Sequence, residues 1–193
     1  MRLRRHALIG LAAAEAWGWL HHLGRTWGST CEERWRYLPG DDLVKNPRLV
    51  TNHARTIKAS AEEIWPWLVQ MGWNRGGWYT YRWVDRFLFP ANHGSADLIL
   101  PEYQDLKVGD RIPDGPPEAD CFYEAELLEP NKFLVLRSRT HLPKHLRRNG
   151  RARMEWTWAF YLDELGENET RLLFRVRGGS SPRFGCGPFI TRR

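Results

Sequence analysis

The sequence predicts an α+β domain in which one strand and two short helices precede an antiparallel sheet. Two observations predict this class. Residues 60–72 join a helix-start signal to apolar residues at a 3.6-residue period, whereas residues 121–177 alternate apolar and polar side chains with a period of two. A chain of 193 residues with 42% hydrophobic content is long enough for one domain with a real core.

Residues 1–27 are predicted to form an apolar N-terminal helix. A basic start precedes an apolar run at 7–20, which Glu15 interrupts. The run is too short to span a bilayer, so we expect a helix that lies on the protein or on a membrane surface. Export or anchoring is the alternative, because a charged start followed by an apolar run is also typical of a signal segment.

Residues 28–49 are predicted to be a linker wrapped on the surface. They carry two proline-containing turn signals, show little periodicity and offer one short helix at 30–37. Asp41 and Asp42 are adjacent carboxylates. Neighbouring side chains in a turn usually point apart, so we interpret the two as a solvated turn or helix cap rather than as an acid–base pair or metal site.

The helix predicted at 60–72 begins with Ser60 and Glu63 at capping-box spacing, which lets hydroxyl and carboxylate satisfy free amides of the first turn. Gly72 stands where a left-handed residue closes a helix. Pro66 predicts a kink, because it removes one backbone hydrogen bond. A strand precedes this helix and a second short helix follows it, at 50–59 and 81–89.

The second half of the domain, which we expect to end at residue 178, is predicted to be an antiparallel meander. One face of the sheet should be apolar and covered by the helices, and the other largely polar. Before the meander, the run at 106–110 is predicted to begin a strand and 112–119 to be a loop. Alternation marks the strands of the meander at 121–128, 133–137, 154–162 and 172–177.

Charge and cysteine content exclude several classes of protein. The net charge of +6 comes from 29 basic and 23 acidic residues mixed along the chain, and the aromatic residues are not interleaved with the basic runs, so we predict no nucleic-acid partner. Three widely spaced cysteines without a CxxC pair indicate a reducing compartment, hence a cytoplasmic protein. His141 and His145 are separated by Pro143 and lack an evident third ligand, so no metal and no cofactor are predicted.

Six stretches carry a resemblance to a known family. They are WGST-x-EER at 27–34, LPGDDLV at 38–44, IWPWLVQMGWNRGGWYTY at 64–81, PEYQDLKVGDRIP at 101–113, WTWAFYL at 156–162 and TRLLFRVR at 170–177. In this order they resemble a bacterial branch of the SRPBCC superfamily, the START-like and polyketide cyclase-like proteins with the helix-grip fold. The resemblance implies a curved sheet that, together with its helices, holds a hydrophobic ligand.

The C-terminus departs from that family. Its members close the cavity with a long C-terminal helix, whereas residues 179–193 contain glycines and prolines that cannot sustain one. We therefore expect an irregular tail and no grip helix. The N-terminal helix, a second copy of the chain in a homodimer, or a membrane would then cover the sheet.

The predicted function is binding or transfer of a small hydrophobic ligand, lipid-like or polyketide-like. A fixed cation beside large aromatic rings after residue 72 predicts a ligand mouth. Arg75 is the predicted anchor for an anionic head group, and a surface arginine in a turn is an equally good interpretation. The other candidate ligand-binding residues, each of which ordinary core packing also explains, are Trp67, Met71, Trp78, Tyr79, Tyr81, Trp156, Trp158 and Phe160.

Two other functions stay open at the level of sequence. One is a cyclase- or dehydratase-type enzyme, for which no spacing or catalytic motif is present. Its acid–base groups would be Tyr79, Tyr81, Arg75, Glu102 and His93. The other is a peripheral membrane protein that meets anionic lipid through its N-terminal helix, using Arg2, Arg4, Arg5, Trp17 and Trp19.

Overall fold

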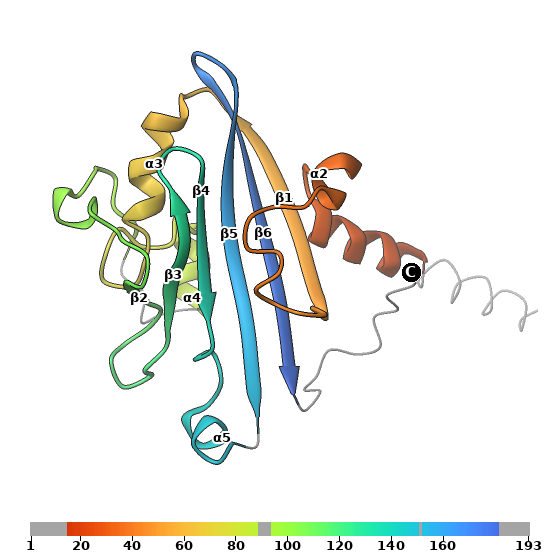
Figure 1. Ribbon diagram of the computed structural model, residues 1–193, viewed down its shortest axis with the longest axis vertical. Coiled ribbons are helices and arrows are strands. Elements are labelled where there is room, and N and C mark those ends of the chain that lie inside the picture. Colours follow the sequence, from red (N-terminus) through yellow and green to blue (C-terminus); the bar gives the residue numbers. More distant parts are fainter. Residues whose placement is uncertain (1–14, 89–93, 151, 182–193) are drawn as a thin grey trace, which may run out of the picture.

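The computed structural model describes residues 15–88, 94–150 and 152–181, and it confirms the α+β class (Figure 1). A curved, six-stranded antiparallel sheet has the strand order β1-β6-β5-β4-β3-β2. The strands are β1 (Leu49–Ile57), β2 (Arg111–Pro113), β3 (Phe122–Glu129), β4 (Phe133–Ser138), β5 (Arg153–Gly166) and β6 (Glu169–Ser181). The helices are α2 (Cys31–Trp35), α3 (Ala61–Val69), α4 (Arg82–Leu88), α5 (Lys144–Arg148) and the short 3-10 helix η1 (Pro101–Tyr103), and residues 15–26 are also helical.

Helix α3 begins as predicted and ends earlier than predicted. Ser60 Oγ accepts from Glu63 N, and Glu63 Oε2 accepts from Ser60 N at 2.9 Å, which forms the capping box. The helix ends at Val69, so Gly72 does not close it. Gly72, with a φ of 132°, instead exchanges two backbone hydrogen bonds of 3.0 and 3.1 Å with Gly77 and closes the next turn.

The start of the meander differs from the prediction. The predicted strand at 106–110 is wrong, because these residues form a turn in which Asp110 N donates to Lys107 O and Lys107 N donates to Asp110 Oδ2. Strand β2 follows, and its residues 112 and 113 fall in the predicted loop. At the other end, β6 continues to Ser181, beyond the predicted domain boundary, and the tail from 182 to 193 lies outside the described residues.

One face of the sheet, which we call the aromatic face, carries Tyr123, Trp156, Trp158, Phe160 and Phe174. Neighbouring strands bring these side chains together, since Phe160 pairs with Phe174 and Trp158 with Val176 in the register of β5 and β6. Helix α3 packs on this face through Ile64 and Leu68, which are buried in the same cluster. This confirms the predicted apolar face with a helix as its cover.

The opposite face, which we call the arginine face, is not the largely polar surface that the alternation predicts. A second buried cluster lies there, made of Leu38, Ala54, Val135, Ala159, Tyr161 and Leu173. Residues 28–46, the covering segment, cross this face with α2 (Figure 1). Tyr161 Oη donates to Pro39 O at 2.7 Å, which fastens the segment to β5.

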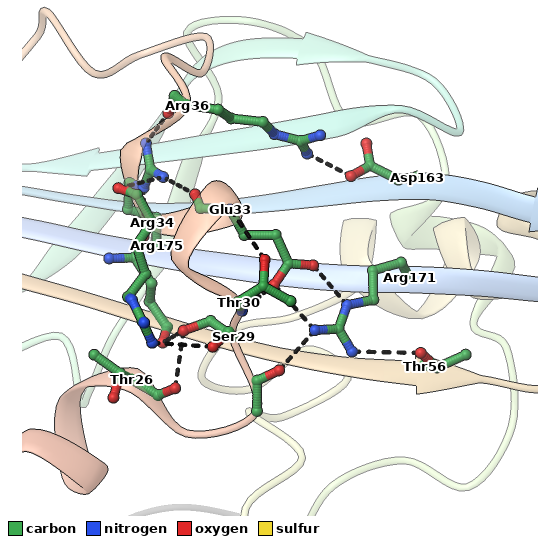
Figure 2. Close-up of polar contacts among 12 residues, drawn as sticks. Thr26, Ser29, Thr30, Glu33, Arg34, Arg36, Thr56, Asp163, Arg171 and Arg175 are labelled. Atoms are coloured by element: carbon green, nitrogen blue, oxygen red, sulfur yellow. Dashed lines mark hydrogen bonds and ion pairs between the residues drawn. The ribbon is translucent and has the colours of Figure 1, made fainter.

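Arg175 holds the covering segment at its centre. Its side chain is 2% exposed, Nε donates to Asn52 Oδ1 at 2.6 Å, and Nη1 donates to Asp41 Oδ2 at 2.5 Å. Its Nη2 donates to Glu33 O at 2.6 Å (Figure 2). The prediction of a solvated turn at 41–42 is therefore wrong for Asp41, which pairs with a buried guanidinium, while Asp42 is exposed.

The outer edge of β1 is occupied by residues 25–29, where the N-terminal helix ends and the covering segment begins. Ala54 N donates to Trp27 O at 3.0 Å, Ser29 Oγ donates to Asn52 O at 3.0 Å, and Arg25 Nε donates to Val50 O at 3.2 Å. Gly28 passes so close to the strand that a Cβ there would lie 2.1 Å from the Ala54 carbonyl oxygen. Only glycine permits this approach.

Among the described residues, no helix has the length and apolar character needed to cross a membrane. The helical stretch 15–26 covers part of the predicted N-terminal helix, whose residues 1–14 lie outside the described part.

Candidate functional site

Side chains of the aromatic face and Trp78 form a continuous set of ring contacts. Trp78 and Trp158 stack with centroids 5.4 Å apart and planes inclined by 24°. Tyr123 lies 5.8 Å from Trp78 and 6.1 Å from Trp158, and Phe160 lies 5.0 Å from Trp158. The alternation of β5 puts Trp156, Trp158 and Phe160 on one face, whereas Trp78 arrives from the loop after Gly77.

The stacked indoles carry two unpaired hydrogen-bond donors. Nε1 of Trp78 and Nε1 of Trp158 are both buried, and neither has an acceptor among the described residues. A buried donor without a partner costs roughly 1–3 kcal/mol, because it has lost its water. This part of the aromatic face therefore has polar groups that a bound molecule could satisfy.

The other predicted ligand residues divide into core and surface. Met71 and Phe160 are buried, at 3% and 5% exposure. Trp67 and Tyr79 form an edge-to-face pair of their own at 5.9 Å, and Tyr79 Oη accepts from Gln70 Nε2 at 2.6 Å. Tyr81 is 75% exposed. The structure thus joins Met71, Trp78, Trp156, Trp158 and Phe160 in one cluster and leaves Trp67, Tyr79 and Tyr81 outside it.

Arg75 is engaged with the end of helix α3. Its Nε donates to Met71 O and its Nη2 to Val69 O, both at 3.0 Å, and the guanidinium lies 4.4 Å above the Tyr103 ring. Burial lowers the pKa of Arg75. Arg75 thus caps carbonyl groups left free where the helix ends, and it is part-buried rather than the surface arginine of the alternative interpretation.

A polar cluster of Asp114, Cys121 and His141 lies beside the aromatic face. One side-chain N, O or S atom of each lies within 4.8 Å of the others. His141 Nε2 is 2.6 Å from Asp114 Oδ2, and Nδ1 is 2.6 Å from Ser138 Oγ. The Tyr123 ring, with its centroid 4.6 Å from that of His141, connects this polar cluster to the stacked indoles.

Burial and charge in the polar cluster shift the pKa values of His141 and Tyr123. Burial alone would lower the pKa of His141, but its hydrogen bonds with Asp114 and Cys121 and their negative charge raise it to about 9. Burial, followed by the charges of Asp114 and Cys121, raises the pKa of Tyr123. The two N–H groups of an imidazolium at this position are bonded to Asp114 and Ser138, so an anionic or carbonyl group could accept from the ring only by replacing one of them.

A cavity of about 610 Å³ lies elsewhere, at the end of the sheet where β5 begins and β6 ends. None of the predicted ligand residues lines it. Its cationic lining is Lys45, Arg48, Arg139, Arg147 and Arg153, and the acidic residue Glu155 there pairs with Arg137 and Arg139. An excess of positive charge in a concave surface favours anions over neutral apolar molecules.

Among the comparisons with known proteins, only the search of solved structures finds similar chains. No protein-family model matches the chain, and no curated protein matches it. Solved structures that it resembles include protein MLL2253 from Mesorhizobium loti, with 18% identity over 68% of this chain and 77% of that one and a TM-score of 0.39. Protein Mll3558 from Rhizobium loti has 14% identity over 68% and 78%, with a TM-score of 0.37. The conserved protein of unknown function EF2215 from Enterococcus faecalis has 17% identity over 75% and 63%, with a TM-score of 0.34. At these identities and TM-scores, the likeness carries no inference about function.

The sequence analysis missed the polar cluster because its members stand far apart along the chain. Each lies at a strand end: Asp114 directly follows β2, Cys121 directly precedes β3, and His141 follows β4. Because β2, β3 and β4 are antiparallel neighbours, these strand ends lie at the same end of the sheet. The β3–β4 hairpin was predictable and would have joined Cys121 to His141, but Asp114 could not be placed while β2 was assigned to a loop.

Proposed function

We propose that the chain is a helix-grip protein of the SRPBCC superfamily that binds a small hydrophobic ligand on its aromatic face. The order of elements supports the fold assignment: α3 and α4 stand between β1 and β2, and β1 pairs with β6 at one edge of an antiparallel sheet. The apolar side chains on that face support the class of ligand.

The unpaired indole donors of Trp78 and Trp158 are the observation that carries this proposal. A flat apolar ligand would replace the stacking of the two rings, and an oxygen acceptor on it would take the indole N–H groups. Trp158 stands on β5, in the middle of the sheet. Trp78 stands on a loop, so its ring can move aside without breaking the hydrogen bonds between strands.

The polar end of such a ligand lies at the polar cluster rather than at Arg75. Arg75 is bonded to carbonyl groups at the end of helix α3, whereas the His141 ring lies in contact with Tyr123 at the end of the aromatic cluster. Both ring nitrogens of His141 are bonded, to Asp114 and Ser138, so an oxygen of the ligand would take the place of one of these partners. A ligand that covers Trp158 and extends past Tyr123 would bring a carboxylate or carbonyl oxygen to His141.

Native mass spectrometry of the full chain, purified without detergent, tests the proposal. We expect a defined lipophilic species bound one-to-one, or one-to-one binding of added anilinonaphthalene sulfonate, a flat apolar anion. Trp158→Leu should weaken binding of this probe at least tenfold, and Trp35→Leu, which changes a tryptophan that is 87% exposed, should leave it unchanged. A wild-type protein that stays free of copurified lipid and of the probe would contradict ligand binding.

A second function, association with a membrane surface, is favoured by the exposure of apolar residues on the N-terminal helix. Trp17 is 71% exposed, Trp19 63% and Leu20 57%. Tryptophan prefers the interface between water and lipid, so these residues can insert at the headgroup level. Co-sedimentation with anionic vesicles should be lost in Trp17→Ser/Trp19→Ser; binding that persists in the double variant would contradict this role.

The enzyme alternative gains no comparable support: Glu102 and Tyr81 are exposed, and His93 lies outside the described residues.

A further inference from the structure

We propose that Asp114, Cys121 and His141 bind one Zn²⁺ ion at the end of the sheet where β2 and β4 end and β3 begins. This site lies at the polar end of the proposed ligand-binding surface. The proposal holds whether or not the aromatic face binds a ligand. The three donor types are a carboxylate oxygen, a sulfur and an imidazole nitrogen, and each comes from a different strand end.

The distances suit a tetrahedral ion. Donor atoms around a tetrahedral zinc, bound at about 2.0–2.3 Å, lie roughly 3.5 Å from one another. The three donor atoms here lie within 4.8 Å of one another, with His141 Nε2 and Asp114 Oδ2 2.6 Å apart. For all three to bind one ion, the hydrogen bond between Nε2 and Oδ2 would open by about 1 Å and the widest separation would close by about as much.

The residues around the donors hold them in the orientation that a metal requires. The Nδ1 atom of His141 bonds to Ser138 Oγ at 2.6 Å, and Ser138 is 3% exposed. This leaves Nε2 to face Asp114 and Cys121, as in zinc sites where the second ring nitrogen bonds a neighbouring oxygen. Thr140 Oγ1 lies 4.0 Å from Cys121 Sγ and also bonds Phe122 N and O at 2.9 Å, which fixes the cysteine at the start of β3.

The donor chemistry selects the ion. A thiolate and a carboxylate together carry two negative charges, which one divalent cation balances, while the neutral imidazole adds none. Magnesium and calcium prefer six or more oxygen donors, whereas a nitrogen, a sulfur and an oxygen suit zinc. Three protein donors leave a fourth position for water or for another molecule.

Cobalt substitution tests the site directly, without an assay of activity. The full chain is stripped of metal, reduced and titrated with Co²⁺, and Zn²⁺ affinity is measured by competition with a chromophoric chelator. We expect one Co²⁺ per chain, with a thiolate-to-cobalt charge-transfer band and the intense visible bands of a tetrahedral ion. Zn²⁺ should displace it.

Matched variants assign the donors. Cys31→Ser/Cys186→Ser keeps Cys121 as the sole thiol and should retain the full spectrum. Cys121→Ser should abolish the charge-transfer band, and Asp114→Asn should weaken Zn²⁺ binding at least tenfold. Ser138→Ala, which removes the group that orients His141, should weaken it about 10- to 100-fold. Circular dichroism of each variant separates loss of metal from loss of fold.

Several results would overturn the proposal. One is a wild-type chain that binds no Zn²⁺ at micromolar concentration. Another is a charge-transfer band that survives Cys121→Ser or disappears in Cys31→Ser/Cys186→Ser, since a thiol elsewhere would then bind the ion. Folded Asp114→Asn and Ser138→Ala proteins with wild-type affinity would also contradict it.

Discussion

The two faces of the sheet are covered in different ways, and the difference separates the fixed part of the molecule from the part that can adapt. On the arginine face, Arg175 donates to side chains and to main-chain carbonyls of the covering segment, so its position is set by directional bonds. On the aromatic face, Trp78 and Trp158 meet through ring stacking and leave their donors unpaired. Directional bonds fix a geometry, whereas stacked rings can exchange one flat partner for another.

Among changes that test this difference between the two faces, removal of Arg175 should lower the free energy of unfolding most. Arg175→Ala leaves the largely buried carboxylate of Asp41 with only a longer ion pair, 3.5 Å to Arg177, and removes the hydrogen bonds to Asn52 and Glu33, so we expect the free energy of unfolding to fall by about 3–5 kcal/mol. Urea denaturation measures the change. Arg55→Ala, an exposed arginine of β1, should cost less than about 0.5 kcal/mol. A loss below about 1 kcal/mol for Arg175→Ala would mean that the covering segment is held by its apolar contacts alone.

Replacement of Trp78 should be tolerated better. Trp78→Phe loses ring contacts with Trp158 but also removes a buried, unpaired donor, so we expect a net loss of about 1 kcal/mol in the free energy of unfolding. Tyr161→Phe on the arginine face is the matched control, because it removes a hydroxyl that is bonded to Pro39 O. We expect it to cost as much as Trp78→Phe despite a smaller change in volume. A loss above about 3 kcal/mol for Trp78→Phe would place that ring in the rigid core.

Acid should weaken the arginine face through Glu33. Its hydrogen bonds with Arg171 lower the pKa of Glu33 from 4.5 to about 2. A carboxyl whose pKa is lower in the folded state stabilises the fold above pH 4.5, and this stabilisation is lost as the pH falls toward 2. Glu33→Gln has no carboxyl group to protonate at this position. Between pH 4.5 and pH 2 we therefore expect its free energy of unfolding, measured by urea denaturation, to fall by about 1 kcal/mol less than that of the wild type. Parallel pH curves would show that the pair contributes nothing.

The smallest effect is expected at Trp35, on the outer side of the covering segment. Helix α2 buries none of its residues, and Trp35 is 87% exposed. Trp35→Ala should therefore change the free energy of unfolding by less than about 0.5 kcal/mol, as measured by urea denaturation. A larger loss would indicate that aromatic packing, as well as the arginine bonds, holds the segment.

Sequence reasoning succeeded where the signal is local. The capping box at Ser60, the alternation of β5 and the helix at 82–88 depend on neighbouring residues, and the structure confirms them. It failed at Asp41, because the partner Arg175 lies far away in the chain and nothing near Asp41 indicates it. The second core was missed for the same reason. The face that carries Val135, Ala159 and Leu173 was predicted to be largely polar, since the segment that buries these residues has no periodicity of its own.

For the candidate site, too, local patterns predicted one part and missed the other. Alternation placed Trp156, Trp158 and Phe160 on one face, and the loop after Gly77 supplied Trp78 as expected. The polar cluster needed the register between strands, which a single sequence does not display.

The contacts along the outer edge of β1 have a consequence for how this protein behaves at high concentration. An edge strand offers free backbone donors and acceptors to any other extended chain, and this is a common start of edge-to-edge aggregation. Here the groups of Val50, Asn52 and Ala54 that would do so are already bonded by Arg25, Ser29 and Trp27. The glycine between Trp27 and Ser29 lets the chain come close enough to make these bonds. One residue without a side chain thereby helps to prevent a strand of a neighbouring molecule from pairing with the β1 edge of the sheet.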